Sequence, residues 1–190
     1  MIFSRGFAPV ALGCAEMRRV FSVLGFLLLG GLCSIGCTSG DNCSSGHHCE
    51  CSEGDQCYLG CDGDGCDQSC HNMNRCGTVC GDSCSSQCHD VQQCSQSCGS
   101  GCGLECSHTN SCGVICGDHC RLDCHDTAQC SAEVGPNSNV TCRSVNSCIV
   151  HCSGSCVVDC AGDGDCQVSC ADNADATDCG QRHFACGGCP

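Results

Sequence analysis

The sequence predicts an all-β fold, a narrow β-helix whose coils of roughly 18 residues are linked by disulfides. Three observations support this prediction. Cysteines recur in the pattern C-x3-C-x3-C-x3-C-x5, large apolar residues are few, and glycine-containing triplets separate cysteine pairs in most repeats. A short repeat with a fixed period is typical of a solenoid.

The composition leaves disulfides as the main stabilising bonds. The 190 residues include 33 cysteines but no tryptophan or lysine. From Thr38 onward there are fifteen isoleucine, leucine and valine residues, and the aromatic residues are Tyr58 and Phe184. The fraction of large apolar residues in this part of the chain is about half of the ~20 % below which chains fail to build a core. Because ordering each residue costs about 1 to 2 kcal/mol of backbone entropy, covalent links must replace the missing core.

The charge excludes simple nucleic-acid binding. The whole chain has a net charge of −14, and from Thr38 onward four arginines against twenty acidic residues give −16. Nucleic-acid binding needs a basic surface. An acidic surface is either simply solvated or attracts divalent cations and basic partners.

Residues 1–36 are predicted to be an N-terminal extension and a signal peptide. Met17-Arg18-Arg19 is a short basic segment, and residues 20–32 are an apolar segment too short for a stable transmembrane helix. Residues 1–16 show little pattern, so translation is expected to begin at Met17. We therefore expect the chain to be exported, which favours disulfide formation.

The segment Ser34-Ile35-Gly36-Cys37 resembles the lipobox of bacterial lipoproteins. The resemblance covers the first 37 residues and departs from the family pattern at Ser34, where leucine is usual. It implies that Cys37 is lipidated, becomes the mature N-terminus and anchors the protein in the membrane of the cell envelope. Cleavage at Cys37 leaves thirty cysteines after it, an even number that can be fully oxidised. Plain signal-peptidase cleavage and secretion is the alternative.

The mature chain is expected to have three parts. Residues 37–56 are interpreted as an anchor and N-terminal cap, residues 57–178 as the repeat solenoid, and residues 179–190 as a C-terminal cap. The defective repeat from Cys130 to Cys142 lacks its middle two cysteines. Complete repeats begin at four cysteines: Cys76, Cys94, Cys112 and Cys148.

Cysteines four residues apart could also lie on one face of a helix, so the residues between them must distinguish a helix from a strand. The residue midway between two cysteines is often aliphatic, as at Leu104 and Val114, which gives C-x-Φ-x-C the alternation of a strand with three inward side chains. Triplets such as Gly81-Asp82-Ser83 favour turns and would break a helix. The five-residue segments are expected to form a third side, with these central residues inward: Met73, Val91, Thr109, Thr127, Val145 and Asp163.

The defective repeat indicates how the cysteines pair. A bond within one C-x-Φ-x-C strand is excluded, because four strand residues span about 13 Å and bridged Cα atoms lie within about 7 Å. Val134 and Ser138 replace the second and third cysteines together, which indicates that these positions are partners across the three-residue turn. Pairing between equivalent positions of adjacent coils, such as Cys98–Cys116, is the alternative. The expected pairs across the two kinds of turn are Cys70–Cys76, Cys80–Cys84, Cys88–Cys94, Cys98–Cys102, Cys106–Cys112, Cys116–Cys120, Cys124–Cys130, Cys142–Cys148, Cys152–Cys156 and Cys160–Cys166.

Two groups of residues are weak candidates for metal binding. Asp62, Asp64 and Asp67 alternate like the start of a calcium loop. His71 and His89 share one column of the repeat and should lie about 4.8 Å apart on adjacent coils. Solvated turn residues are the alternative in both cases.

Cysteine chemistry is not expected. Thiolate metal sites use closely spaced cysteines, and the mature chain has such spacing only in Cys49-Glu50-Cys51 and Cys186-Gly187-Gly188-Cys189. Resemblance to metallothioneins is confined to composition. We interpret the second segment as a closing staple rather than a redox pair, because no thioredoxin-like alternation of strands and helices surrounds it.

The sequence thus leaves two classes of function. The first is a non-catalytic structural or adhesin-like lipoprotein of the cell envelope or surface, without a cofactor or nucleic-acid partner. The second is an exported protein that binds calcium, zinc or copper ions. Insect antifreeze proteins have a similar stapled β-helix, but their Thr-x-Thr ladder is absent here, since Thr109 and Thr127 are the only stacked threonine pair. No catalytic motif is present, so an enzyme is not expected.

Overall fold

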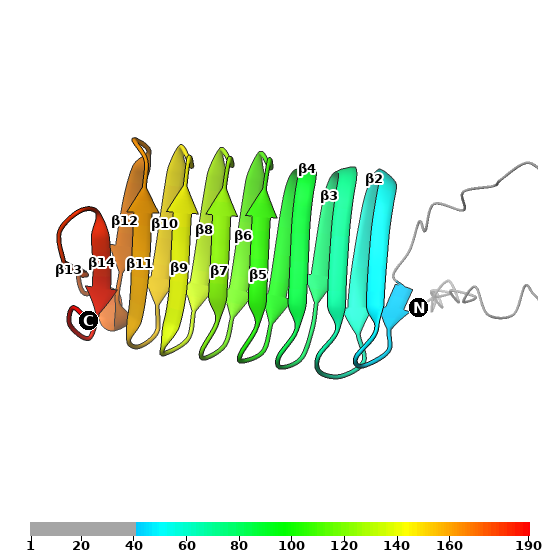
Figure 1. Ribbon diagram of the computed structural model, residues 1–190, viewed down its shortest axis with the longest axis horizontal. Coiled ribbons are helices and arrows are strands. Elements are labelled where there is room, and N and C mark those ends of the chain that lie inside the picture. The colour runs from blue at the N-terminus through cyan, green and yellow to red at the C-terminus, as the bar shows by residue number, and fades with distance from the viewer. Residues whose placement is uncertain (1–40) are drawn as a thin grey trace, which may run out of the picture. The chain divides into compact units, whose positions relative to one another are not determined.

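The fold is described by a computed structural model for residues 41–190, which form a β-solenoid of about seven turns (Figure 1). The predicted all-β solenoid with regular cysteine pairs is thereby confirmed. The predicted signal peptide, the lipobox-like segment and Cys37 lie outside the described residues. Within residues 41–190, none of the helices has the length and apolar character needed to cross a membrane.

Each coil contains two strands. A three-residue turn, called here the narrow turn, joins them, and a five-residue wide turn leads to the next coil. In the first coils the strand pairing continues through the wide turn, so single long strands run over both sides. The strands are β1 (Asp41–Cys43), β2 (His48–Cys61), β3 (Asp67–Val79), β4 (Ser85–Cys98), β5 (Gly103–Ser107), β6 (Ser111–Cys116), β7 (Arg121–His125), β8 (Gln129–Val134), β9 (Ser138–Arg143), β10 (Ser147–Cys152), β11 (Cys156–Ala161), β12 (Asp165–Ser169), β13 (Thr177–Asp178) and β14 (His183–Cys186).

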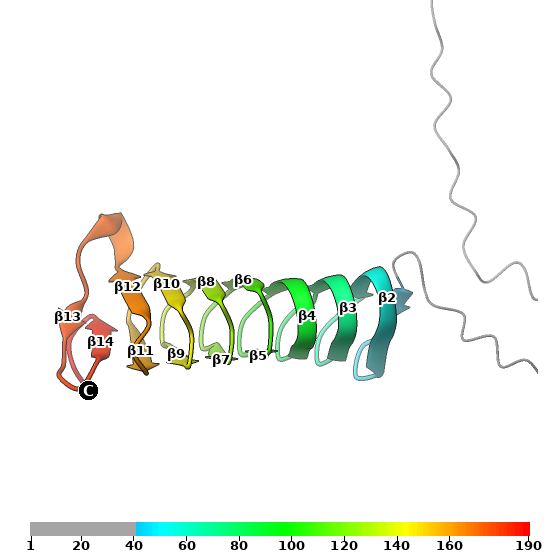
Figure 2. The ribbon, with the colours of Figure 1, turned by 90° about the horizontal axis from the view of Figure 1, so that it is seen from above.

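Equivalent strands of successive coils pair in parallel with an 18-residue register, as in Cys94↔Cys112 and Cys106↔Cys124. The order β12-β10-β8-β6-β4 forms one side of the coil and is called ladder 1, and β4-β5-β7-β9-β11 forms ladder 2. Strand β4 belongs to both because it bends through the wide turn. Figure 2 shows the ladders on opposite sides of a flattened coil.

Short strands cover both ends of the solenoid. At the N-terminal end, β1 pairs with β2, and Cys43 lies opposite Cys61. At the C-terminal end, β14 runs antiparallel to β11 and is followed outward by β13. Such pairing protects exposed sheet edges from uncontrolled strand addition.

Disulfides link the two ends of nearly every turn. The Cα atoms of each bridged pair across these turns are 6.1 to 6.5 Å apart, and the pairs are those expected across the narrow and wide turns rather than between equivalent positions of adjacent coils. In the defective repeat, Val134 and Ser138 take the positions of the missing cysteine pair, and their side chains are buried, at 2 % and 1 % exposed. At the C-terminal end, Cys186 bonds to Cys170 and Cys189 to Cys179. The segment 186–189 therefore closes the end of the coil through two separate partners.

The side chains midway between cysteines point inward along the whole solenoid, although some of them are polar. The first coils contain Gln68, Thr78, Ser86 and Gln96 at these positions, all at most 2 % exposed. Gln96 Nε2 donates hydrogen bonds to the Ser86 and Glu105 carbonyl oxygens at 3.1 and 3.3 Å. Later coils have aliphatic residues there, namely Leu104, Val114, Leu122, Ala132, Val140, Val150 and Val158.

Glycine occupies the first position of four successive narrow turns, at Gly81, Gly99, Gly117 and Gly135. The N–H group of Gly99 donates to the Gly81 carbonyl oxygen at 2.9 Å, and Gly117 and Gly135 continue this ladder. A Cβ atom on Gly135 would lie 2.6 Å from the Gly117 carbonyl oxygen. The close stacking of these four turns therefore leaves no room for a side chain at their first position.

The wide turns place their central residues inside the coil, as the sequence predicts, with one exception. Thr109 and Thr127 are 4 % and 2 % exposed and hydrogen-bond to each other at 3.3 Å, so the stacked threonine pair does not face solvent. Asp163 is exposed, contrary to the expectation from its column. A carboxylate is costly to bury without a partner, and its neighbours Gly162 and Gly164 allow the last wide turn a different path.

Candidate functional site

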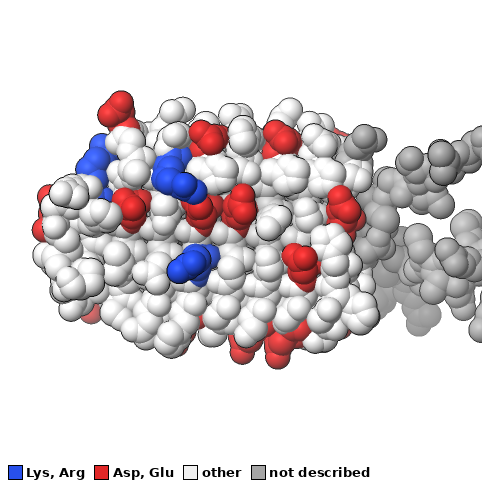
Figure 3. All heavy atoms as spheres, viewed as in Figure 1, with Lys and Arg blue, Asp and Glu red and all other residues white. Residues whose placement is uncertain are grey.

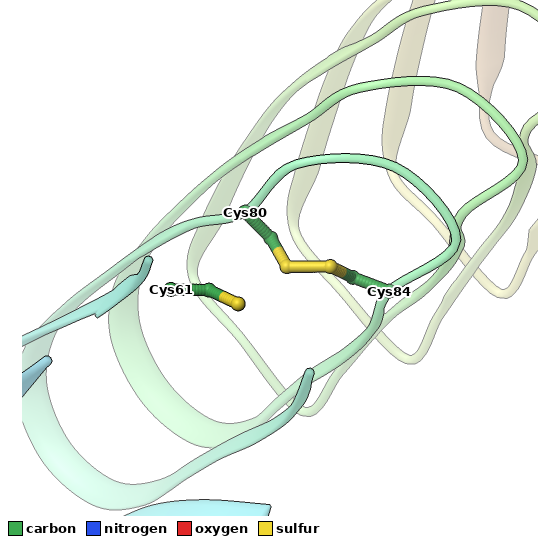
Figure 4. Close-up of side chains that lie close together, drawn as sticks. All are labelled: Cys61, Cys80 and Cys84. Carbon is green, nitrogen blue, oxygen red and sulfur yellow. A yellow bond between two sulfur atoms is a disulfide. The ribbon is translucent and has the colours of Figure 1, made fainter. Parts of the chain in front are cut away.

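The buried sulfur atoms form close groups, but they are not metal ligands. Four groups of three cysteines have sulfur atoms within 4.8 Å of one another. Figure 4 shows one group, in which Cys61 lies beside the Cys80–Cys84 disulfide. Cys61 is itself bonded to Cys66. Thiolates, not disulfide sulfurs, bind metals, and all thirty cysteines of residues 41–190 are in disulfides.

The structure does not bring the predicted calcium ligands together. Asp64 Oδ1 accepts a hydrogen bond from the backbone N–H of Asp82 at 2.8 Å. Asp67 Oδ2 lies 2.9 Å from His48 Nδ1 on the neighbouring coil. Within the described chain, Asp62, Asp64 and Asp67 do not form a group of three ligand atoms within 4.8 Å. Asp64 therefore links two adjacent narrow turns, and Asp67 contacts a histidine.

The predicted histidine pair forms part of a larger group. The rings of His71 and His89 are stacked with their centroids 4.9 Å apart and an interplanar angle of 2°. His71 Nε2 lies 2.5 Å from Glu50 Oε1, and His48 Nε2 lies 3.9 Å from Glu50 Oε2. We call His48, Glu50, His71 and His89 the histidine cluster. It lies at the N-terminal end of the solenoid, where His71 and His89 begin their wide turns and His48 and Glu50 precede the wide turn of the first coil.

Each histidine of the cluster has a polar partner at Nδ1. Asp67 Oδ2 is 2.9 Å from Nδ1 of His48, and Asp90 Oδ2 is 3.2 Å from Nδ1 of His89. The side-chain amide of Asn72 lies 3.0 Å from Nδ1 of His71. A carboxylate at Nδ1 favours the tautomer with its proton there, which leaves Nε2 as the lone-pair nitrogen.

Glu50 is the central acidic group of the cluster. The hydrogen bond from His71 lowers the pKa of Glu50, and the charges of His71, His48 and His89 act in the same direction, while desolvation opposes them. Glu50 is therefore ionised near neutral pH and can attract a cation.

His125 lies in the same column two coils further along, but both of its ring nitrogens are occupied. Its Nδ1 lies 3.0 Å from Asp126 Oδ2 and its Nε2 lies 3.3 Å from Glu105 Oε1. The hydrogen bond to Asp126 raises the pKa of His125, with Glu105 and Asp123 contributing, against desolvation. This environment favours an imidazolium, which cannot bind a metal.

One histidine contacts a serine hydroxyl. His151 Nδ1 lies 3.0 Å from Ser169 Oγ on the next coil. Among the described residues no carboxylate is within salt-bridge distance of His151. The pair therefore lacks the third group that orients the base in a catalytic triad.

The outer surfaces of the two ladders differ in charge. Acidic and basic side chains are scattered over the side of the molecule in Figure 3, and Arg143 contacts Asp123 on ladder 2. The outward residues of ladder 1 include the exposed Ile115 and Ile149 and two acidic residues, Glu133 and Asp165. The other outward residues of β6, β8, β10 and β12 are Gly113, Ser131, His151, Gln167 and Ser169, with Ser111, Gln129 and Ser147 at the strand starts.

Comparison with known proteins gives no family for this chain. No protein-family model matches it, and neither do the curated proteins or the solved structures that were compared.

Sequence reasoning identified His71 and His89 but not the rest of the cluster. The pairing of β2 with β3 has a 19-residue register, as in Cys51↔Cys70, because of the extra residue between Cys61 and Cys66. When the sequence is written in lines of 18 residues, His48 and Glu50 are therefore displaced by one position from the residues that they face in the structure. Shifting the first line by the insertion places His48 opposite Asp67 and Glu50 opposite Ser69, two residues before the position of His71.

Proposed function

We propose that this protein is a non-catalytic structural component of the cell envelope or cell surface, an adhesin-like rod held at the membrane by a lipid on Cys37. The observation that carries the proposal is that the described chain uses all thirty of its cysteines in disulfides. A reactive cysteine must be a thiolate, so the sulfur atoms here serve only to hold the coils. An oxidised chain of this kind fits an exported location.

The shape of the solenoid supports a role as a short spacer. About seven coils at ~4.8 Å each give a rise of about 34 Å along the axis. Backbone hydrogen bonds run along this axis in both ladders, and a disulfide limits bending at most corners. The outer face of ladder 1 has few charged side chains. Contact with another molecule would therefore remove little water from charged groups.

Lipid attachment tests the location. In a bacterial host with the lipoprotein pathway, the wild-type protein should incorporate labelled palmitate and partition into the detergent phase. The Cys37→Ser variant should lose both properties, whereas the matched Cys33→Ser variant should keep them. An unlabelled wild-type protein in the aqueous phase would refute the anchor.

Thiol counting tests the structural role of the cysteines. Mass spectrometry of the mature protein after alkylation without reductant should detect no modified cysteine, and reduction should then expose thirty thiols after Cys37. Alkylation of several cysteines without reduction would contradict the proposal and favour a thiolate function.

A further inference from the structure

We propose that the histidine cluster is a surface binding site for a divalent transition metal of the zinc type, with Nε2 of His48, His71 and His89 and a carboxylate oxygen of Glu50 as ligands. This inference does not depend on the proposed envelope function. Imidazole nitrogen and carboxylate oxygen are ligands that Zn²⁺ accepts in four-coordinate sites.

The backbone supplies the spacing that such a site needs. The stacked His71 and His89 rings project from neighbouring coils that are fixed by the β3–β4 ladder, in which His71 lies directly opposite His89. Glu50 comes from the preceding coil and already contacts His71. Three successive coils thus contribute to one surface point, and the coil stacking restrains their backbones.

The partners at Nδ1 resemble the second shell of a metal site. Histidines that bind metals usually donate their other ring N–H to a carboxylate or carbonyl, which fixes the tautomer and increases ligand basicity. Asp67 and Asp90 accept in this way from His48 and His89. The Asn72 amide lies at the same position of His71, where its oxygen can accept the Nδ1 proton once the amide is turned.

Closure around a metal requires the ligand side chains to rotate. In the described conformation the four ligand atoms do not lie within 4.8 Å of one another. The His48 and His89 side chains are 54 % and 40 % exposed, so their rotamers can change without disturbing the core.

The purified, fully oxidised protein provides the direct test, because it has no free thiols among its described residues to compete for metal. Titration with Zn²⁺ in a calorimeter should give one site per chain, confirmed by metal analysis after gel filtration. His71→Ala should lower the affinity at least tenfold, and Glu50→Gln should also lower it. Asp67→Asn should weaken binding roughly 10-fold if it acts as a second-shell partner.

His125→Ala is the matched control, since His125 belongs to the same column but has both nitrogens held by carboxylates. It should leave Zn²⁺ affinity and stoichiometry unchanged. Absence of a stoichiometric Zn²⁺ site in the wild type would overturn the proposal, as would equal losses in His71→Ala and His125→Ala. Circular dichroism of each variant checks that the coil is intact, and Glu50→Gln, at an exposed position, remains informative if His71→Ala fails to fold.

Discussion

The first coils and the later coils have the same ladders and the same kinds of disulfide, but their interiors differ. In the first coils Gln68, Thr78, Ser86 and Gln96 fill the space between the ladders, whereas aliphatic residues such as Leu122 fill it later. The polar side chains are largely hydrogen-bonded inside the coil, as in the 2.8 Å contact between Thr78 Oγ1 and Ser86 Oγ. Disulfides at the corners set the width of the coil. Polar and aliphatic residues therefore both fit inside it, provided that the polar atoms are hydrogen-bonded.

One polar atom in the first coils lacks such a partner. Gln68 Nε2 donates to the carbonyl oxygens of Leu59 and Val79, but Gln68 Oε1 is buried without a hydrogen bond. An unpaired buried acceptor costs about 1 to 3 kcal/mol. The first coils therefore depend on their disulfides more than the later coils do.

Full reduction should have the largest effect on both regions. Each small loop restricts the unfolded chain by about 2 kcal/mol in the entropy model, and fifteen disulfides are removed together. We expect the β-type circular dichroism signal to disappear. Under partial reduction, hydrogen exchange should show protection lost first in residues 66–98. A spectrum unchanged after complete reduction and alkylation would show that the disulfides are not the main support.

Truncation of the aliphatic interior should be the next largest effect. Leu122 is 1 % exposed, so Leu122→Ala should destabilise the oxidised protein by about 2 to 5 kcal/mol through lost burial and a cavity. Ser86→Ala, the matched change in the first coils, removes a hydroxyl and should cost about 1 kcal/mol. Guanidinium unfolding of the oxidised variants measures both. Equal losses of stability in the two variants would mean that the polar and the aliphatic interior contribute equally to stability.

Restoring the missing disulfide should stabilise the later region. The neighbouring pairs Cys116–Cys120 and Cys152–Cys156 have Cα separations of 6.3 and 6.1 Å, and Val134 lies in register with Cys116 and Cys152. The double variant Val134→Cys with Ser138→Cys should form the bond and gain up to about 2 kcal/mol. Val134→Cys alone cannot form it and serves as control. A double variant that retains two free thiols would contradict the predicted geometry.

The smallest effect is expected from replacing the unpaired glutamine. Gln68→Leu keeps a similar volume and removes the orphan oxygen, but it also removes the donor to the Leu59 and Val79 carbonyl oxygens. The gain and the loss partly cancel, so stability should change by less than about 1 kcal/mol. Gln96→Leu should cost more, because the Ser86 hydroxyl loses a hydrogen-bond donor in addition to the carbonyl oxygens of Ser86 and Glu105. Chemical denaturation of the two variants side by side checks the order. The reverse order would show that Gln68 Oε1 has a partner, such as a bound water.

The fold could be predicted from cysteine spacing because the repeat fixes both the strands and the turns. The polar interior was missed since Gln68 and Gln96 carry side chains that are usually solvated, and only the ladder register shows that they point inward. Metal candidates His71 and His89 followed from their shared column, whereas Glu50 required the 19-residue register of the first coils. The antiparallel β14 strand has no counterpart in the repeat, so its contact with β11 could not be predicted.

The disulfides that link adjacent turn ends have a consequence for the order of folding. Bonds such as Cys98–Cys102 and Cys106–Cys112 join residues only four or six positions apart. Each can close as soon as a few further residues have emerged from the ribosome or the export channel, before the following coil exists. The chain can therefore be oxidised progressively from its N-terminus, and the more widely spaced Cys170–Cys186 and Cys179–Cys189 bonds at the C-terminal end close last.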